Sequence, residues 1–184
     1  MFDVLPTPLT GLTLLERQVI ADARGFLSRL YCAEELRKAG IDKPIAQINH
    51  TLTRTSGTVR GMHFQYPPHA EVKLVTCLKG EILDVAVDVR RDSPTFLSWH
   101  GEILSETNRR SLLIPEGFAH GFQALSENCE LLYLHTAAYR AEAEGALNVA
   151  DPRLKITWPL PIRELSDRDR AHPFVGADFP GVRS

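Results

Sequence analysis

The sequence has little excess charge and no long run of apolar residues. Its 21 Lys and Arg nearly balance its 23 Asp and Glu, which gives a formal net charge of −2. This balance lacks the basic surface with which nucleic-acid-binding proteins contact phosphates, so we predict no nucleic-acid partner. The apolar stretches are of strand length, well below the roughly 18 residues of a membrane-spanning helix. We therefore expect a soluble protein that does not associate with a membrane.

Cysteine is also scarce. The three cysteines, Cys32, Cys77 and Cys129, are odd in number and lack a metal-binding spacing. This pattern excludes a disulfide framework and fits a reducing compartment. Residues 1–13 contain no basic segment followed by a long apolar one, so we expect no secretory signal. The prediction is a cytoplasmic protein.

Short strand-like patterns make up most of the sequence. With 184 residues and 43% hydrophobic content, the chain suffices for one well-covered core, so we predict a single domain over residues 1–184. From Ile45 onward, short alternating or β-branched stretches are separated by Gly, Pro, Asn and Ser clusters, which favours a β-sandwich or barrel. A short helix is predicted in "CAEELRKAG", with Gly40 beyond its end, and a helical turn in "SDRD", with Ser166 as N-cap.

Two features of the central strands can be predicted from local pattern. Lys79 and Gly80 separate two strand-like segments and predict a two-residue hairpin that pairs them. In "EILDVAVDV", the period of two places every second residue from Leu83 to Val89 on a core face. Asp84 and Asp88 then lie on a mixed opposite face.

Several strands carry one ionisable group each on a partly apolar face. Lys73 shares its face with Val75 and Cys77, Tyr133 shares its face with His135, and an extended "VRGMHFQ" would separate Arg60 from His63. A small barrel with a polar-lined mouth would gather such groups from strands that are remote in sequence.

The segment "PEGFAH" matches the second half-motif of the cupin superfamily, in which Pro and Gly shape a turn and the histidine, here His120, enters the barrel. The other half-motif needs Gly, five residues and His-x-His; Gly57 and His63 fit, but Gln65 stands at the second histidine position. Since a transition metal needs three or four imidazole or carboxylate ligands, His63, Glu71 and His120 are at most an incomplete triad, and we predict no metal. Ordinary hydrogen-bonded or surface imidazoles are expected at His50, His69, His100, His135 and His172.

Joint motifs over most of the chain resemble the dTDP-4-dehydrorhamnose 3,5-epimerase family. They are "QIN", "GTVRGMHFQYPP", "EVKLVTCLKGEILDVAVDVRRDSPTF", "LSETNRRSLLIPEGFAHGFQALS" and "DPRLKITWP", within a resemblance from about Asp22 to Pro173. The resemblance implies an all-β cupin jelly-roll barrel with short peripheral helices, without metal or cofactor and usually a homodimer. It implies an isomerase acting on a nucleotide-sugar substrate, with dTDP-4-dehydro-6-deoxyglucose 3,5-epimerisation as the leading activity. The product would supply an activated deoxysugar to surface polysaccharide or glycoside assembly.

The resemblance also implies catalytic roles. A C4 ketone acidifies the hydrogens on C3 and C5, so a base can remove one and leave an enolate that is reprotonated from the opposite face. By resemblance His63 is the base, Asp169 the carboxylate that orients it, Tyr133 the acid, and Lys73 the charge that stabilises the enolate. Asp84 remains an alternative partner of His63.

Substrate contacts follow from the resemblance in the same way. The matching positions are Arg60 and His120, with Arg24, Gln47, Asn49, Glu144 and Arg168 as outer contacts. At Arg29 the chain departs from a common family Glu, and an arginine there would favour cytosine acceptors over the thymine N3–H, unless it turns to solvent or phosphate. A second departure is "YLH" in place of Tyr-Lys. A CDP-sugar enzyme, a single-centre C3 or C5 epimerase and a non-catalytic sugar-nucleotide-binding cupin therefore stay open as alternatives.

Overall fold

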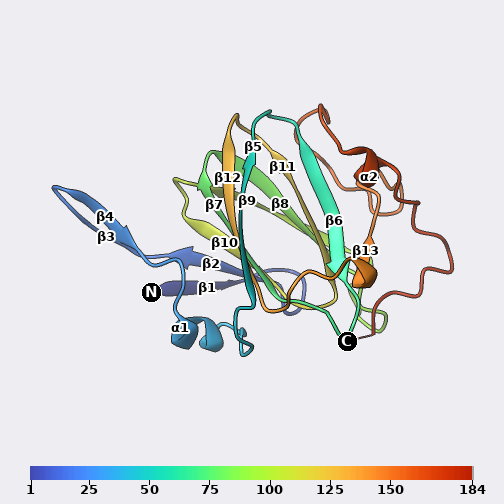
Figure 1. The fold of residues 1–184 in the computed structure, drawn as a ribbon, viewed down its shortest axis with the longest axis horizontal. Coiled ribbons are helices and arrows are strands. Elements are labelled where there is room, and N and C mark those ends of the chain that lie inside the picture. Colours follow the sequence, from blue (N-terminus) through green and yellow to red (C-terminus); the bar gives the residue numbers. More distant parts are fainter. Residues whose placement is uncertain (184) are drawn as a thin grey trace.

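Two antiparallel sheets face each other and form a jelly-roll barrel in the computed structural model, which describes residues 1–183 (Figure 1). The six-stranded sheet runs in the order β1 (Phe2–Pro6), β2 (Thr13–Arg17), β10 (Arg110–Ile114), β7 (Lys73–Lys79), β12 (Cys129–His135) and β5 (Gln47–Thr53). The five-stranded sheet runs in the order β13 (Glu144–Ala146), β6 (Val59–Gln65), β11 (Phe118–Ala124), β8 (Glu81–Asp88) and β9 (Trp99–Ser105). The predicted all-β cupin fold is confirmed.

The remaining elements lie outside the barrel. Strands β3 (Val19–Asp22) and β4 (Gly25–Ser28) form a hairpin that projects away from it (Figure 1). Three short helical segments are α1 (Ala33–Lys38), the 3₁₀ turn η1 (Ala141–Ala143) and α2 (Asp167–Arg170). Both predicted helical segments are confirmed: Gly40 follows α1 with φ of +106°, and the Ser166 side chain accepts the Asp169 N–H at the start of α2. Among the described residues, no helix is long and apolar enough to cross a membrane.

The core has separate clusters on the two faces of β8. Ile82 and Ala86 point between the sheets, where they pack with Val75 and other apolar side chains. Val85 and its alternating neighbours lie on the outer face, against a second cluster that includes Val149 of the C-terminal segment. The prediction that the Leu83–Val89 face is buried is confirmed, but the other face is buried as well. Alternation marks the two faces of a strand and does not show that a remote segment covers the outer one.

The hairpin predicted at Lys79 and Gly80 is wrong. Strand β7 pairs with β10 and β12, while β8 pairs with β11 and β9, so the two strands belong to different sheets. Gly80 does adopt a positive φ of +79°. Gly80 therefore has the backbone conformation that the sequence predicts, but long-range strand pairing makes this turn a crossing between sheets.

The register between β6 and β11 is irregular beside the cavity. His120 of β11 pairs with His63 of β6, and Phe122 of β11 pairs with Arg60 of β6. Two steps along β11 therefore correspond to three steps along β6. The extra residue in β6 is a bulge, which re-aims neighbouring side chains. Arg60 and His63 consequently both line one cavity, and their predicted separation on opposite faces is wrong.

Candidate active site

A cavity of about 850 Å³ opens between the sheets, a size typical of small-molecule sites. Strands of both sheets and the C-terminal segment contribute to its wall. All four predicted catalytic residues line it: His63, Lys73, Tyr133 and Asp169. The topology thus brings together side chains that lie up to 106 positions apart in the sequence.

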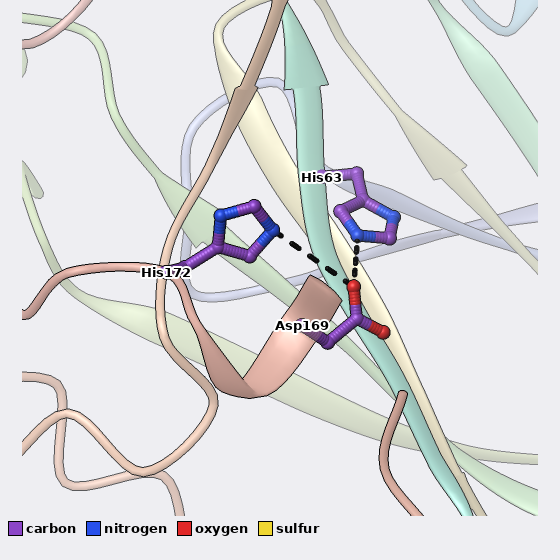
Figure 2. A group of neighbouring side chains, drawn as sticks. All are labelled: His63, Asp169 and His172. Atoms are coloured by element: carbon purple, nitrogen blue, oxygen red, sulfur yellow. Dashed lines mark hydrogen bonds and ion pairs between the residues drawn. The ribbon is translucent and has the colours of Figure 1, made fainter. Parts of the chain in front are cut away.

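His63 and Asp169 form a hydrogen-bonded dyad (Figure 2). The Nε2–H of His63 donates to Oδ1 of Asp169 over 2.7 Å, while the Gly61 N–H lies 3.4 Å from Oδ2. Burial opposes ionisation of Asp169, but the hydrogen bond and charge of His63 outweigh it and keep the Asp169 pKa below its usual value. An ionised carboxylate on Nε2–H leaves Nδ1 of His63 as the proton acceptor.

Asp84 forms a hydrogen bond with a different histidine, His120. Its Oδ1 lies 2.7 Å from Nε2 of His120, and both side chains are buried. This pairing leaves Asp169, and not Asp84, as the carboxylate on His63. His120 also lines the cavity, with its ring edge-on to that of Tyr133 at a centroid distance of 5.9 Å.

Tyr133 presents its phenol to the same cavity. Burial, followed by the negative charge of Asp84, raises the Tyr133 pKa far above its usual value. The phenol therefore stays protonated at neutral pH. Such a weak acid still gives its proton readily to a carbanion-like carbon, which is a much stronger base.

Lys73 is fixed by a buried polar network. Its Nζ lies 3.1 Å from the backbone oxygen of His63 and 3.3 Å from Oε1 of Glu71. The other Glu71 oxygen lies 2.8 Å from Nδ1 of His135, whose ring stacks on Tyr133 with centroids 5.9 Å apart. Burial opposes ionisation of Glu71, but His135 and the positive charge of Lys73 outweigh it and lower the Glu71 pKa. A fixed cation therefore lies at the cavity wall.

The sequence did not identify Glu71 and His135 as parts of this network. From sequence alone, Glu71 fits only a metal-ligand role and His135 only an ordinary hydrogen-bonded or surface imidazole. Both line the cavity. The signal that could have found His135 was its shared strand face with Tyr133.

The predicted substrate contacts fall into two groups. Arg60, Asn49, Glu144 and Arg168 line the cavity, and Arg168 forms an ion pair with Glu144. Gln47 lies beside the wall, where its side-chain N–H donates to Oδ1 of Asn49 over 3.1 Å.

Arg24 and Arg29 are not brought to this cavity. Arg24 extends from the β3–β4 hairpin and pairs with Asp22. Arg29, directly after β4, pairs with Glu35 of α1. The hairpin projects away from the barrel, so neither guanidinium lines the site of its own chain (Figure 1).

The three candidate metal ligands of the sequence do not converge. Glu71 binds Lys73 and His135, and His120 binds Asp84, as described above. Within residues 1–183, the three-residue group whose ligand atoms all lie within 4.8 Å of one another is instead His63, Asp169 and His172 (Figure 2). The incomplete triad of His63, Glu71 and His120, which the sequence leaves as a possibility beside the prediction of no metal, is therefore not assembled.

Comparison with known proteins gives a consistent family. Residues 6–176 match the family model described as dTDP-4-dehydrorhamnose 3,5-epimerase. A Pseudomonas aeruginosa dTDP-4-dehydrorhamnose 3,5-epimerase is 44% identical over 171 residues, which cover 91% of this chain and 93% of the relative. A Shigella flexneri relative of the same name is 40% identical over 179 residues, with coverage of 96% and 98%.

Solved structures agree with this match. A Legionella pneumophila dTDP-6-deoxy-D-glucose-3,5-epimerase in complex with dTDP-4-keto-L-rhamnose is 35% identical, covers 100% of both chains and has a TM-score of 0.92. A 3'-monoepimerase from Streptomyces bikiniensis in complex with dTDP-quinovose is 33% identical, with coverage of 92% and 86% and a TM-score of 0.85. The chain belongs to the dTDP-4-dehydrorhamnose 3,5-epimerase family and is an isomerase of the carbohydrate-epimerase class.

Proposed function

We propose that this chain epimerises C3 and C5 of dTDP-linked 4-keto-6-deoxyglucose, with His63 as base and Tyr133 as acid. The observation that carries the proposal is the convergence of the His63–Asp169 dyad, Lys73 and Tyr133 on one cavity. The complex of the Legionella pneumophila relative with dTDP-4-keto-L-rhamnose supports the choice of nucleotide and sugar.

Proton removal begins at His63. Asp169 holds the Nε2–H, so the lone pair of Nδ1 takes the proton from the carbon next to the ketone. The electrons of the broken C–H bond move into the C4 ketone and form an enolate. Lys73 places its positive charge where the enolate oxygen develops negative charge, which lowers the barrier most because the charge is already in position.

Reprotonation occurs from the opposite face of the sugar. The Tyr133 hydroxyl gives its proton to carbon and the C4 ketone re-forms. The phenolate then takes a proton from solvent, and the His63 imidazolium releases to solvent the proton that it removed, so both groups are ready for the next cycle. Each cycle inverts one carbon, so two cycles complete the 3,5-epimerisation. These transfers use only side-chain groups, and we expect full activity after exhaustive chelation.

Recognition of the nucleotide extends the site beyond one chain. The part of the nucleotide-sugar site that lies in the barrel consists of Arg60, His120, Asn49, Gln47, Glu144 and Arg168. The Arg60 guanidinium suits phosphate or sugar oxygens. In a homodimer, Arg24 and Arg29 of a second copy complete the site. Large apolar side chains exposed on the hairpin and on the edge strand β5 support the dimer: Ile20, Phe26, Leu27, Ile48 and Leu52.

The proposed compartment is the cytoplasm. Cys32, Cys77 and Cys129 are all free thiols, and two of them are buried. The pattern suits a reducing environment.

The decisive experiment follows the sugar by NMR in D2O. With dTDP-4-keto-6-deoxyglucose, deuterium should enter both C3 and C5 while the product with both centres inverted accumulates. CDP-linked substrate serves as the comparison and should turn over more slowly. Absence of exchange at both carbons with either nucleotide would leave only a sugar-nucleotide-binding cupin.

A single-centre epimerase is the second candidate. Its support is the similarity to the Streptomyces bikiniensis 3'-monoepimerase, which shares the fold at a TM-score of 0.85. Deuterium at C3 alone, with C5 unexchanged after complete turnover, would select it.

A further inference from the structure

His172 lies beside the His63–Asp169 dyad and has no role in the proposed reaction. It follows α2, and its backbone oxygen accepts the side-chain N–H of Asn148 over 2.6 Å. Its ring meets the ring of His63 edge-on, at 77° and a centroid distance of 6.1 Å (Figure 2). Unlike His63 and Asp169, it does not belong to the cavity wall.

The Nε2 atom of His172 points toward an oxygen that is already bonded. It lies 3.9 Å from Oδ1 of Asp169, the atom that accepts the His63 hydrogen bond (Figure 2). Nε2 is buried, yet among the described residues it has no hydrogen-bond partner. A buried polar atom without a partner costs free energy that a suitable ligand would recover.

Three ligand atoms therefore converge on one point. Nε2 of His63 and Nε2 of His172 lie 2.7 Å and 3.9 Å from Oδ1 of Asp169, and the three residues offer ligand atoms that all lie within 4.8 Å of one another. Zinc–nitrogen and zinc–oxygen bonds of about 2.0–2.2 Å place neighbouring ligands of a tetrahedral ion roughly 3.3 Å apart. Small side-chain rotations would bring the three atoms to that spacing.

We propose that His63, Asp169 and His172 form an inhibitory site for a divalent transition metal, with Zn²⁺ as the ion that fits best. Two imidazoles and one carboxylate suit zinc and leave a fourth position for water. Mg²⁺ prefers an octahedron of oxygen ligands and does not fit this set. The metal would act as an inhibitor and not as a cofactor, because it binds His63, the proposed base.

The expected inhibition follows from where the metal binds. It takes Nε2 of His63 and so replaces the hydrogen bond to Asp169 that orients the base. Its positive charge also makes Nδ1 a poorer proton acceptor. Because His172 lies outside the cavity wall, the nucleotide-sugar site stays open. Zn²⁺ should therefore lower kcat and leave nucleotide affinity nearly unchanged.

Loss of activity rests on the proposed function, but binding of the metal does not. Isothermal titration calorimetry with ZnCl₂ therefore tests the site directly, and proton exchange in D2O tests its effect. Wild type should bind one Zn²⁺ per chain at this site and lose exchange activity with the same midpoint. Titration with MgCl₂ should do neither.

His172→Gln is the informative variant, and His100→Gln is its matched control. Removing a group that merely supports a ligand costs about 10–100-fold in metal affinity, so removing a ligand should cost at least about 100-fold. His100 is as exposed as His172, at 20% against 21%, and its Nε2 is likewise buried and unpartnered beside one carboxylate, that of Glu102. It lacks a second imidazole, so His100→Gln should bind Zn²⁺ like wild type.

The outcomes separate the site from the function. His172→Gln should keep metal-free activity and escape inhibition by Zn²⁺; His172→Asn gives the same comparison if the glutamine variant does not fold. Equal zinc affinity in wild type and the His172 variants would overturn the proposed site. Zinc binding that depends on His172 without any loss of exchange would keep the site and instead remove His63 from the role of base.

Discussion

The barrel cavity and the β3–β4 hairpin differ in how their polar side chains are buried and held. In the cavity, Asp169 and Lys73 are buried and each is held by more than one partner. On the hairpin, the Arg24 side chain is 90% exposed and its partner is Asp22, its neighbour in the same turn. The groups that we propose for proton transfer are thus positioned by one chain before substrate arrives. Arg24 has no such positioning within this chain.

The largest expected effect is loss of the base. His63→Ala should lower C–H exchange by about 10²–10⁴-fold, the usual contribution of a positioned general base. The fold should be retained and nucleotide affinity should stay near wild type, because the cavity keeps its other walls. Deuterium exchange and calorimetry with dTDP measure the two properties. His69→Ala is a control, since His69 does not line the cavity, and wild-type exchange in His63→Ala would move the base elsewhere.

Tyr133→Phe should separate the two halves of the reaction. It deletes only the hydroxyl, so His63 can still remove a proton and return it to the same face. We expect net epimerisation to fall by about 10²-fold or more, while exchange with retention persists. NMR of recovered substrate and product in D2O distinguishes the two. The matched control is Tyr66→Phe, outside the cavity wall; full epimerase activity in Tyr133→Phe would assign the acid to another group.

Disrupting the hairpin should break the contribution of the second chain and leave the barrel intact. The double variant Phe26→Ser, Leu27→Ser removes two exposed apolar side chains and should shift the protein from dimer to monomer in sedimentation. Each lost hydrogen bond to a charged group is worth about 1.5–3 kcal/mol, so dTDP affinity should fall at least about tenfold. Phe174→Ser, at a side chain that is also exposed, is a control elsewhere on the surface. An unchanged dimer with unchanged affinity would confine the site to one chain.

Arg29→Glu sharpens the question of base recognition. If Arg29 of a second copy reads the base, replacing its donors by acceptors should raise the affinity for dTDP relative to CDP by about 1–3 kcal/mol, beyond the ratio of the wild-type protein. Competition binding of the two nucleotides measures the ratio. Arg37→Glu on α1 makes the same charge change as a control. The same ratio in wild type and Arg29→Glu would leave Arg29 with its Glu35 partner and no part in recognition.

The smallest expected effect is on stability at low pH. The folded-state pKa of Asp169 lies below its unfolded value of about 3.9, so the unfolded chain binds more protons in that range. The Asp169 contribution to stability is complete above the unfolded pKa and is lost as pH falls through the folded pKa. Urea unfolding from pH 6 to pH 3 should therefore show a steeper loss in wild type than in Asp169→Asn. Parallel slopes would mean that His63 does not stabilise the ionised carboxylate.

Much of the site follows from residue types and strand faces. Lys73 beside Val75, and Tyr133 on the face of His135, were placed correctly because a strand alternates its side chains with a fixed period. The bulge in β6 could not be predicted, since it depends on how β11 pairs with it, and it reverses the predicted relation of Arg60 to His63. The same holds for the choice between Asp84 and Asp169, which only the packing of α2 against β6 resolves.

The sequence by itself determined the strand-rich composition, the two short helical segments and the family of the chain, because these depend on local chemistry and on motifs. The tertiary structure decided that β7 and β8 enter different sheets, that the C-terminal segment covers the outer face of β8, and that His172 faces the His63–Asp169 dyad. Each of these is a contact between segments remote in sequence. Their free energy depends on how whole strands pair and pack, which no local pattern encodes.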